Sequence, residues 1–532
     1  MKRQLLLFCL WMIILFACQQ GPDKTAEKPE PRTGGIYRAA LPQTPRDLDP
    51  AFSTDIYSIT LIQQIFDGLV QFDQNLNVVP ALATDWRVST DGLVYTFNLR
   101  SGVTFHNGRE VTAEDFVYSF NRILDPKERA GALSFFEKIK GADDYRSGRD
   151  KKVEGLRALG PLTLEITLEE PFAPFLSVLA MKDSKVVPRE ELERWGKDFG
   201  HHPVGTGPFR LESFGQDLIV LGANLEYFEG RPYLDKVTYS VFPGAQREKI
   251  AEEFMQGRLE EAALFGRTRE QVVGKAIYQL VRKPTLSLLF YGMNCRSEPF
   301  NDPLLRKAIN YAINKQRIVL EVYEQQFVVA YSLLPPGMPG HFPEDGLLAH
   351  DTQKAKELLA KAGYGSSVPP PNLTLLSASR SKAAEQEFEL LTQDLAAVGI
   401  SLQVEYETDW TKFEALLRQG RFMMYRYAWF ADVPDPDNFL GVLCSSDSTY
   451  NFMGYEDPQV DRLLSDALVQ ADPLKRAALY RQAEDLIEED VPLVPILYLT
   501  FESAFQPYVK GLQISALGAP YIPLKKIWLD KG

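Results

Sequence analysis

The sequence predicts an α/β protein whose 532 residues form two or more lobes. Three observations lead to this prediction. Chains beyond about 250–300 residues no longer build a single hydrophobic core. The first half carries the alternating pattern of β-strands, whereas the second half repeats helix and strand with short links, which is typical of an open α/β sheet. The composition, 45% hydrophobic and 24% charged, is that of an ordinary globular protein.

The N-terminus has the pattern of a secretion signal. Lys2 and Arg3 precede an unbroken apolar run over residues 5–16. Because a membrane-spanning helix needs about 20 apolar residues, this run suits the core of a signal peptide, with a short buried helix as the alternative. The run ends in Leu-Phe-Ala-Cys, which resembles the lipobox of bacterial lipoproteins. The resemblance implies a signal peptide over residues 1–17 and a diacylglyceryl anchor on the thiol of Cys18.

The segment that follows is predicted to be a flexible tether. Residues 18–34 are polar and rich in Pro, Gly, Lys and Glu, with no apolar period. Such a stretch cannot bury enough surface to fold.

The charge balance argues against one class of partner. The formal net charge is −13, and loss of the signal with its two basic residues makes it more negative. Nucleic-acid binding demands clustered Lys and Arg, so we predict no nucleic-acid partner.

The first half is predicted to be rich in strands. Apolar residues alternate over 93–99, 162–168 and 237–241. Turn residues at 90–92 and an Asn-Gly pair at 107–108 separate the first of these strands from its neighbours.

The second half alternates helices and strands. Asp302 and Pro303 supply an N-cap and a first-turn proline to a helix. The later elements expected are helices near 384–398, 411–419, 458–471 and 473–488, strands near 400–406 and 422–430, and an apolar stretch at 492–501.

No standard catalytic or metal-binding pattern is found in the sequence. GxSxG, HExxH, CxxC and the phosphate-binding GxxxxGK pattern are missing. Of five histidines only His201 and His202 are neighbours, and adjacent residues do not converge well on one metal. We therefore predict a protein that is not an enzyme and that has neither a metal site nor a cofactor.

Three segments carry a resemblance to a known family. The first runs from Ala83 to Phe116, the second is the Val-Gly-Thr-Gly-Pro-Phe stretch at 204–209, and the third is 227–235. They resemble bacterial extracellular solute-binding proteins of family 5, which include oligopeptide-, dipeptide-, nickel- and heme-binding proteins. The likeness extends from about Gly35 to the C-terminus. Because these segments are mostly hairpins and turns, they indicate the fold and leave the ligand open.

The resemblance implies a two-lobe, periplasmic-binding-protein-like fold of class II, cluster C type. Lobe I would comprise residues 35–280 and 501–532, with an extra β-rich subdomain inserted at about 76–202. Lobe II would comprise residues 281–500, and a two-segment hinge would join the lobes. Ligand would bind between open lobes, and closure would bury it.

The resemblance also implies a function and a location. The chain would be the substrate-binding lipoprotein of an ABC importer, a monomer held outside the cytoplasm in the periplasm or on the outer face of the cell membrane. It would capture peptides, oligopeptides above all, and deliver them to a membrane permease whose ATPase supplies the work. The alternatives are another cargo on the same fold (a nickel or other metal chelate, heme or an oligosaccharide), a secreted peptide chaperone, or a hydrolase.

Residues 426–432, Arg-Tyr-Ala-Trp-Phe-Ala-Asp, form the candidate binding stretch. They lie at the carboxyl end of a predicted strand, which is where open α/β sheets bind ligands. The stretch resembles that of oligopeptide-binding proteins with an Arg six residues before an Asp. The resemblance implies that Asp432 pairs with the peptide α-ammonium, that Arg426 meets the peptide carboxylate, and that Trp429 forms a wall of the cleft.

Each of these residues has a structural alternative. Asp432 could cap a turn, Arg426 could form a salt bridge within its lobe, and Trp429 could be core. The acidic residues between 432 and 437 could also form a weak calcium loop.

Two cysteines remain outside the signal and lipidation site. Cys295 and Cys444 would lie in an oxidising compartment, where a disulfide is permitted. The sequence leaves both a disulfide and two free thiols open.

Overall fold

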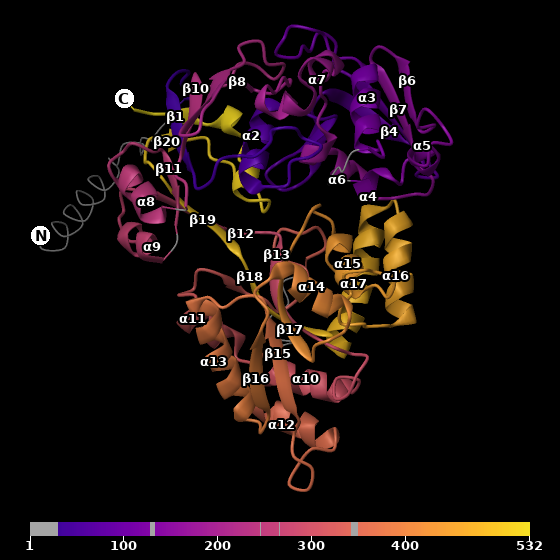
Figure 1. Ribbon diagram of the computed structural model, residues 1–532, viewed down its shortest axis with the longest axis vertical. Helices are drawn as coiled ribbons and strands as arrows, with labels where there is room; N and C mark the ends of the chain where they lie inside the picture. The colour runs from indigo at the N-terminus through magenta and orange to yellow at the C-terminus, as the bar shows by residue number, and fades with distance from the viewer. Residues whose placement is uncertain (1–29, 128–132, 245, 265, 342–348, 532) are drawn as a thin grey trace, which may run out of the picture.

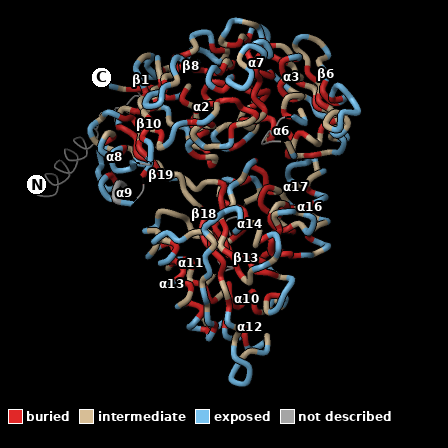
Figure 2. Tube along the Cα trace, viewed as in Figure 1, coloured by how far each residue is buried: buried red, intermediate tan, exposed pale blue. Residues whose placement is uncertain are grey.

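The chain folds into two lobes that face each other across a cleft (Figure 1). The structure is a computed structural model that describes residues 30–127, 133–244, 246–264, 266–341 and 349–531. The predicted signal peptide and the predicted lipidation site, Cys18, lie outside the described residues. Buried residues gather in the interior of each lobe (Figure 2), so each lobe has its own core.

The main sheet of lobe I joins segments far apart in the chain. Its order is β1-β10-β9-β8. Strand β1 (Ile36–Leu41) pairs in parallel with β10 (Lys236–Val241), and β9 (Leu218–Ala223) and β8 (Phe209–Phe214) continue the sheet antiparallel. Helix α2 (Ile56–Ile65) and residues near the C-terminus pack into the same core. The C-terminal segment therefore belongs to lobe I.

A second sheet of lobe I forms the expected β-rich subdomain. Its order is β4-β5-β7-β6, and all its pairings are antiparallel. The strands are β4 (Ala83–Val88), β5 (Val94–Leu99), β7 (Thr163–Thr167) and β6 (Leu156–Gly160), and helix α3 (Ala113–Ile123) packs on them. Every second residue of β5 is buried, which is the alternation that the sequence predicted.

Two glycines connect this subdomain to the main part of lobe I. A Cβ atom at Gly205 would lie 2.1 Å from the carbonyl oxygen of Ile65, and one at Gly207 would lie 2.5 Å from the carbonyl carbon of the same residue. His106 Nε2 lies 3.0 Å from the Gly207 carbonyl oxygen. Burial lowers the pKa of His106 to about 4, so the ring is neutral at pH 7. The Val-Gly-Thr-Gly-Pro-Phe stretch is thus a close backbone contact with the end of α2.

Lobe II is built on one mixed sheet of the order β14-β18-β13-β17-β15-β16. Strands β15, β16 and β17 are mutually parallel, and β13 and β18 run antiparallel to their neighbours. The strands are β13 (Ser287–Met293), β14 (Val328–Val329), β15 (Asn372–Ser377), β16 (Ser401–Tyr406), β17 (Met424–Phe430) and β18 (Leu493–Tyr498).

Helices cover both faces of the lobe II sheet. Leu288 and Phe290 of β13 pack into one core cluster, whereas Leu289 and Tyr291 pack into another, as alternate residues of a strand should. On the Leu289 face lie α10 (Pro303–Ala312), α11 (Lys315–Glu321), α12 (Thr352–Lys361) and α13 (Lys382–Ala396), and on the Leu288 face lie α14 (Trp410–Arg418), α15 (Leu440–Cys444), α16 (Pro458–Val469) and α17 (Pro473–Asp490). The predicted open α/β sheet is therefore confirmed.

The chain crosses between the lobes twice. Strand β12 (Gln279–Pro284) leads into lobe II, and β19 (Thr500–Phe505) returns. The two strands pair antiparallel, and β11 (Glu261–Ala263) pairs with the other edge of β19. The lobe boundaries expected after residues 280 and 500 fall within β12 and at the first residue of β19.

Shorter elements complete the described chain. Among the described residues, no helix has both the length and the apolar character needed to cross a membrane. The remaining elements are β2 (Val70–Phe72), β3 (Val78–Pro80), α4 (Leu133–Phe136), α5 (Ala142–Arg146), α6 (Phe175–Leu179), η1 (Lys182–Ser184), α7 (Arg189–Trp195), η2 (Gly196–His201), α8 (Arg247–Met255), α9 (Gly266–Val272), η3 (Pro436–Asn438), η4 (Ala519–Tyr521), β20 (Val509–Lys510), η5 (Leu524–Lys526) and β21 (Trp528–Leu529).

We predict that Gly207→Ala destabilises lobe I. The added Cβ would overlap the backbone at the end of α2, which cannot move without opening the core, and overpacking of this kind costs about 1–3 kcal/mol or more. Urea unfolding followed by circular dichroism measures the loss. Gly160→Ala in β6 is the control, because a Cβ there meets nothing within 4 Å. Equal stability of the two variants would contradict the close-contact account.

Candidate ligand-binding cleft

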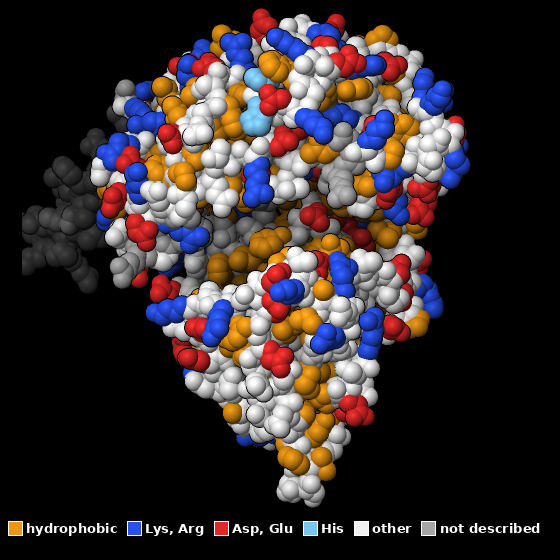
Figure 3. Space-filling model, viewed as in Figure 1, with side chains coloured by type: hydrophobic (Ala, Val, Ile, Leu, Met, Phe, Trp, Pro, Cys, Tyr) orange, Lys and Arg blue, Asp and Glu red, His pale blue; other side chains and the backbone are white. Residues whose placement is uncertain are grey.

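The carboxyl ends of three strands of lobe II point toward lobe I. Strand β13 leaves the crossing strand β12 and runs away from lobe I, so β17, antiparallel to β13, runs back toward it. Strands β15 and β16 run parallel to β17 and end at the same edge. Figure 3 shows the hollow between the lobes, with hydrophobic and acidic side chains along it. This edge is where an open α/β sheet binds ligands.

Asp432 lies at this edge, two residues after the end of β17. Its backbone N–H donates to Asn438 Oδ1 at 2.8 Å, which fixes the residue at the start of the loop. Its side chain is exposed in the cleft, and no described residue forms a hydrogen bond or ion pair with its carboxylate. Partial burial raises the pKa of Asp432, and the charge of Asp183 raises it further. The charge of Lys182 acts in the opposite direction. The carboxylate thus lacks the cation that would stabilise its charge.

Lobe I presents its own polar groups to Asp432. Lys182 and Asp183 of η1 form an ion pair, with side chains only 11% and 13% exposed. The Tyr521 hydroxyl of η4 lies in the same region. Burial raises the pKa of this phenol, and the nearby carboxylates of Asp183 and Asp432 raise it further. Asp432 of lobe II therefore faces a carboxylate, an ammonium and a phenol of lobe I.

Arg426 is engaged within lobe II. Its guanidinium donates to both carboxylate oxygens of Glu387 in α13, with Nε–Oε1 at 2.9 Å and Nη2–Oε2 at 3.0 Å. Tyr291 donates to Glu387 at 2.6 Å, and Tyr323 donates to its other oxygen. The Glu387 side chain is fully buried and that of Arg426 is 17% exposed. This geometry matches the structural alternative for Arg426, a salt bridge within the lobe.

Trp429 is partly buried and anchors the loop after β17. Its Nε1–H donates to the Asn438 carbonyl at 2.6 Å, and its ring meets Tyr450 edge-on with centroids 5.2 Å apart. It packs against the core cluster on the Leu288 face of the sheet. These contacts match the core alternative for Trp429, and its role as a wall of the cleft stays a prediction.

The sequence analysis missed a cation and three aromatic side chains at the same edge. Arg380 follows β15, stacks over Tyr406 with 5.1 Å between guanidinium carbon and ring centroid, and lies 3.6 Å from Glu385. Trp410, at the start of α14, is 52% exposed, and Phe430, at the end of β17, is 57% exposed. The signal was available, because parallel strands end at one edge and the residues after 377, 406 and 430 must therefore be neighbours.

Metal and disulfide chemistry find no support in the described part of the chain. No group of three or more potential metal ligands occurs there. Cys295 and Cys444 are free thiols that contact the same core cluster, and burial raises the pKa of each. Of the two alternatives that the sequence left open, the structure has two thiols.

The fold and the cleft define a two-lobed ligand-binding protein. The sequence profile of the "Bacterial extracellular solute-binding proteins, family 5 Middle" matches residues 77–451. The chain belongs to this family, as the resemblance of its sequence segments indicated. The family consists of solute-binding proteins rather than enzymes.

Curated relatives and solved structures are similar over most of the chain. The glutathione-binding protein GsiB of Escherichia coli O6:K15:H31 is 28% identical over 485 residues, which cover 88% of this chain and 90% of that protein. The murein tripeptide-binding protein MppA in its unliganded open form matches with a TM-score of 0.84 and 25% identity, covering 94% of this chain and 98% of MppA. The binding protein DppA of Helicobacter pylori in complex with the peptide STSA matches with a TM-score of 0.73 and 29% identity, covering 94% and 99%.

The two structural comparisons also describe the state of the cleft. The match is better with an unliganded open form than with a peptide complex, at equal coverage of this chain. The arrangement of the lobes is thus more similar to that of the open MppA structure than to that of the DppA complex. Next to Asp432, Val433 is buried against the core of the lobe I subdomain, so the two lobes are in contact at this point.

We predict that Arg426→Met lowers the free energy of unfolding by about 3–5 kcal/mol, because it leaves the Glu387 carboxylate buried without its cation. Denaturant unfolding checks this value. The double variant with Glu387→Gln should recover part of the loss. Unchanged stability of Arg426→Met, combined with lost ligand binding, would instead favour the role at the peptide carboxylate.

Proposed function

We propose that the chain is the substrate-binding lipoprotein of an ABC importer and that it captures short peptides between its lobes. One observation carries the proposal: Asp432 offers an unpaired carboxylate at the ligand-binding edge of lobe II. An α-ammonium is the complement of such a group, and a charge pair at about 4 Å is worth roughly 4 kcal/mol at an effective dielectric near 20, before desolvation. The similar proteins are named for glutathione binding and murein tripeptide binding, or have a structure in complex with the peptide STSA. These names support this cargo class.

The peptide carboxylate would meet Arg380 rather than Arg426. Arg380 follows β15, which is the parallel neighbour of β17, so its guanidinium and the Asp432 carboxylate extend from adjacent strand ends. Its contact with Glu385 is long and exposed, and such pairs contribute little. Adjacent strands are about 4.8 Å apart, and the long side chains at their ends can place the two charged groups farther apart than this. An extended tripeptide spans about 10 Å, so the two groups match the ends of a peptide of a few residues.

The exposed aromatic side chains would cover the apolar parts of the peptide. Trp410 begins α14, which follows β16, and Phe430 ends β17, so both lie at the same edge of the sheet as Arg380 and Asp432. Apolar walls with the two charged ends fixed would tolerate many side chains, because specificity is then carried by the backbone termini.

Closure would make the binding productive. A peptide held by lobe II gains the contacts of Asp183, Lys182 and Tyr521 only when lobe I approaches, so the ligand stabilises the closed form. The closed protein would then dock on a membrane permease, and an ATPase subunit would supply the work. This chain itself would act as a monomer and break no bond.

We predict that Asp432→Asn weakens peptide binding at least about 30-fold, since truncating one partner of a desolvated charge pair costs about 2–5 kcal/mol. Calorimetric titration of residues 19–532 with trialanine measures the effect. Acetylation of the peptide amine should weaken binding to the parent protein by the same factor. It should cause no further loss of affinity in Asp432→Asn. Amidation of the peptide carboxylate should likewise weaken binding to the parent protein and cause no further loss of affinity in Arg380→Gln.

Asp466→Asn is the matched control, because Asp466 is exposed on α16, away from the three strand ends. A loss of affinity in the control equal to that in Asp432→Asn would contradict the assignment of the ammonium site.

The location rests on the N-terminal sequence. We predict that Cys18→Ser moves the protein from the membrane pellet to the supernatant, because without the thiol no diacylglyceryl group can be attached. Fractionation of cells that express the full chain measures this. Cys295→Ser should stay with the membrane, and retention of Cys18→Ser in the pellet would contradict the lipid anchor.

A further inference from the structure

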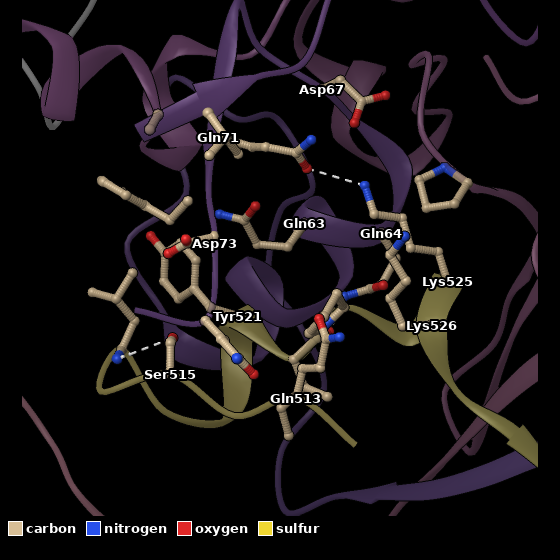
Figure 4. A pocket seen from close by; sticks show the side chains of 18 of the residues that line it. Gln63, Gln64, Asp67, Gln71, Asp73, Gln513, Ser515, Tyr521, Lys525 and Lys526 are labelled. Carbon is tan, nitrogen blue, oxygen red and sulfur yellow. Dashed lines mark hydrogen bonds between the residues drawn. The ribbon is translucent and has the colours of Figure 1, made fainter. Parts of the chain in front are cut away.

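A polar cavity of about 410 Å³ lies in lobe I (Figure 4). Helix α2, the β2–β3 hairpin and the C-terminal segment enclose it, and Gln63, Gln71, Asp73, Gln513 and Tyr521 are among the side chains on its walls. Its volume falls in the range of small-ligand sites. No part of lobe II lines it, so it exists before the lobes close.

The cavity lies beside the ligand-binding cleft. The Leu286 N–H donates to the Ala516 carbonyl, and the Ala431 N–H donates to the Leu286 carbonyl, so one backbone path joins the cavity wall at 515–517 to the residue before Asp432. Tyr521, on the wall, is close enough to Asp432 and Asp183 for both carboxylates to raise its pKa. A ligand held at Asp432 could therefore extend past Tyr521 into the cavity.

The carboxylates on the cavity wall already have partners. Asp67 accepts hydrogen bonds from Thr206 Oγ1 at 3.0 Å and from the Tyr227 hydroxyl at 3.2 Å. Glu229 pairs with Lys525 at 2.8 Å. Burial raises the pKa of Asp67, and the charges of Lys525 and Lys185 act in the opposite direction, so both acids are stabilised by cations of lobe I.

Two buried donors on the wall have no hydrogen-bond acceptor among the described residues. Lys185 lines the cavity and is only 5% exposed, and no described residue accepts a hydrogen bond from its ammonium or forms an ion pair with it. Burial lowers its pKa to about 8, while Asp67 partly opposes this. The buried Nε2 group of Gln63 is close to Tyr521 but makes no well-formed hydrogen bond with a described residue. The Asp67 carboxylate stabilises the buried Lys185 ammonium through its charge but accepts no hydrogen bond from it, so an anion in the cavity would stabilise the ammonium further.

We propose that this cavity is a subsite for a carboxylate of the bound peptide, held by Lys185 and Gln63, so that the preferred cargo is a short acidic peptide. The inference rests on the proposed peptide-binding function. The subsite would lie on lobe I and Asp432 on lobe II, so an acidic peptide would contact both lobes through charged groups.

Matched peptide pairs test the inference on the unaltered protein. Tripeptides of alanine that carry Glu or Gln at position 1, 2 or 3 differ only in the side-chain carboxylate. Calorimetry of residues 19–532 should show that, at one position, the Glu peptide binds about tenfold more tightly or better. Lys185→Met should abolish that preference while keeping the affinity for the Gln peptide. Lys412→Met, whose side chain is 70% exposed on α14, should leave the preference intact.

Other results would overturn the inference. Equal affinity of the Glu and Gln peptides at all three positions would do so even if Lys185→Met failed to fold. Glutarate that binds through Lys185 without competing with the peptides would assign the cavity to a free acid. A failure of the proposed function looks different: neither peptide would bind to the parent protein.

Discussion

The site depends on one constraint of topology, the direction in which β13 leaves the hinge. Because β12 and β19 pair with each other between the lobes, β13 must start at the cleft and run away from it. Strand β17 pairs antiparallel with β13, and β15 and β16 follow β17, so three carboxyl ends are delivered to the cleft together. Polar groups that follow these strands become neighbours although the chain separates them widely.

Burial decides which charges are left for a ligand. The Arg426 guanidinium is mostly buried against the sheet, where a charge without a partner would be costly. The Glu387 carboxylate supplies the opposite charge. Arg380 and Asp432 lie at the rim, where water can solvate them until a ligand arrives. Lys185 is an exception, since it is buried beside Asp67 but donates no hydrogen bond to a described residue. The Arg426–Glu387 pair is thus satisfied inside lobe II. By contrast, Asp432 and Arg380 at the edge of the sheet and Lys185 in the adjoining cavity are left for a ligand.

Much of the fold could be predicted from the sequence. The alternation in β5, the N-cap and proline of α10, and the helix–strand order of lobe II all follow from local patterns, and the structure confirms them. The parallel pairing of β1 with β10 and the return of the C-terminal segment to lobe I could not be predicted from pattern, because pairing between distant segments leaves no local signal. The position of Asp432 was predictable as the end of a strand. For Arg426 a salt bridge within the lobe was one of the alternatives, but its partner was not predictable, because Glu387 lies on a helix whose contact with that strand only the folded sheet creates.

The central claim is that the open cleft collects peptides. Native mass spectrometry of residues 19–532, as purified from cells, tests it most directly, because ligands captured during expression remain bound under native conditions. The account predicts a ragged set of extra masses that disappears on denaturation and fragments as short peptides. A single discrete extra mass that fragments as a porphyrin, a metal chelate or a sugar would contradict it.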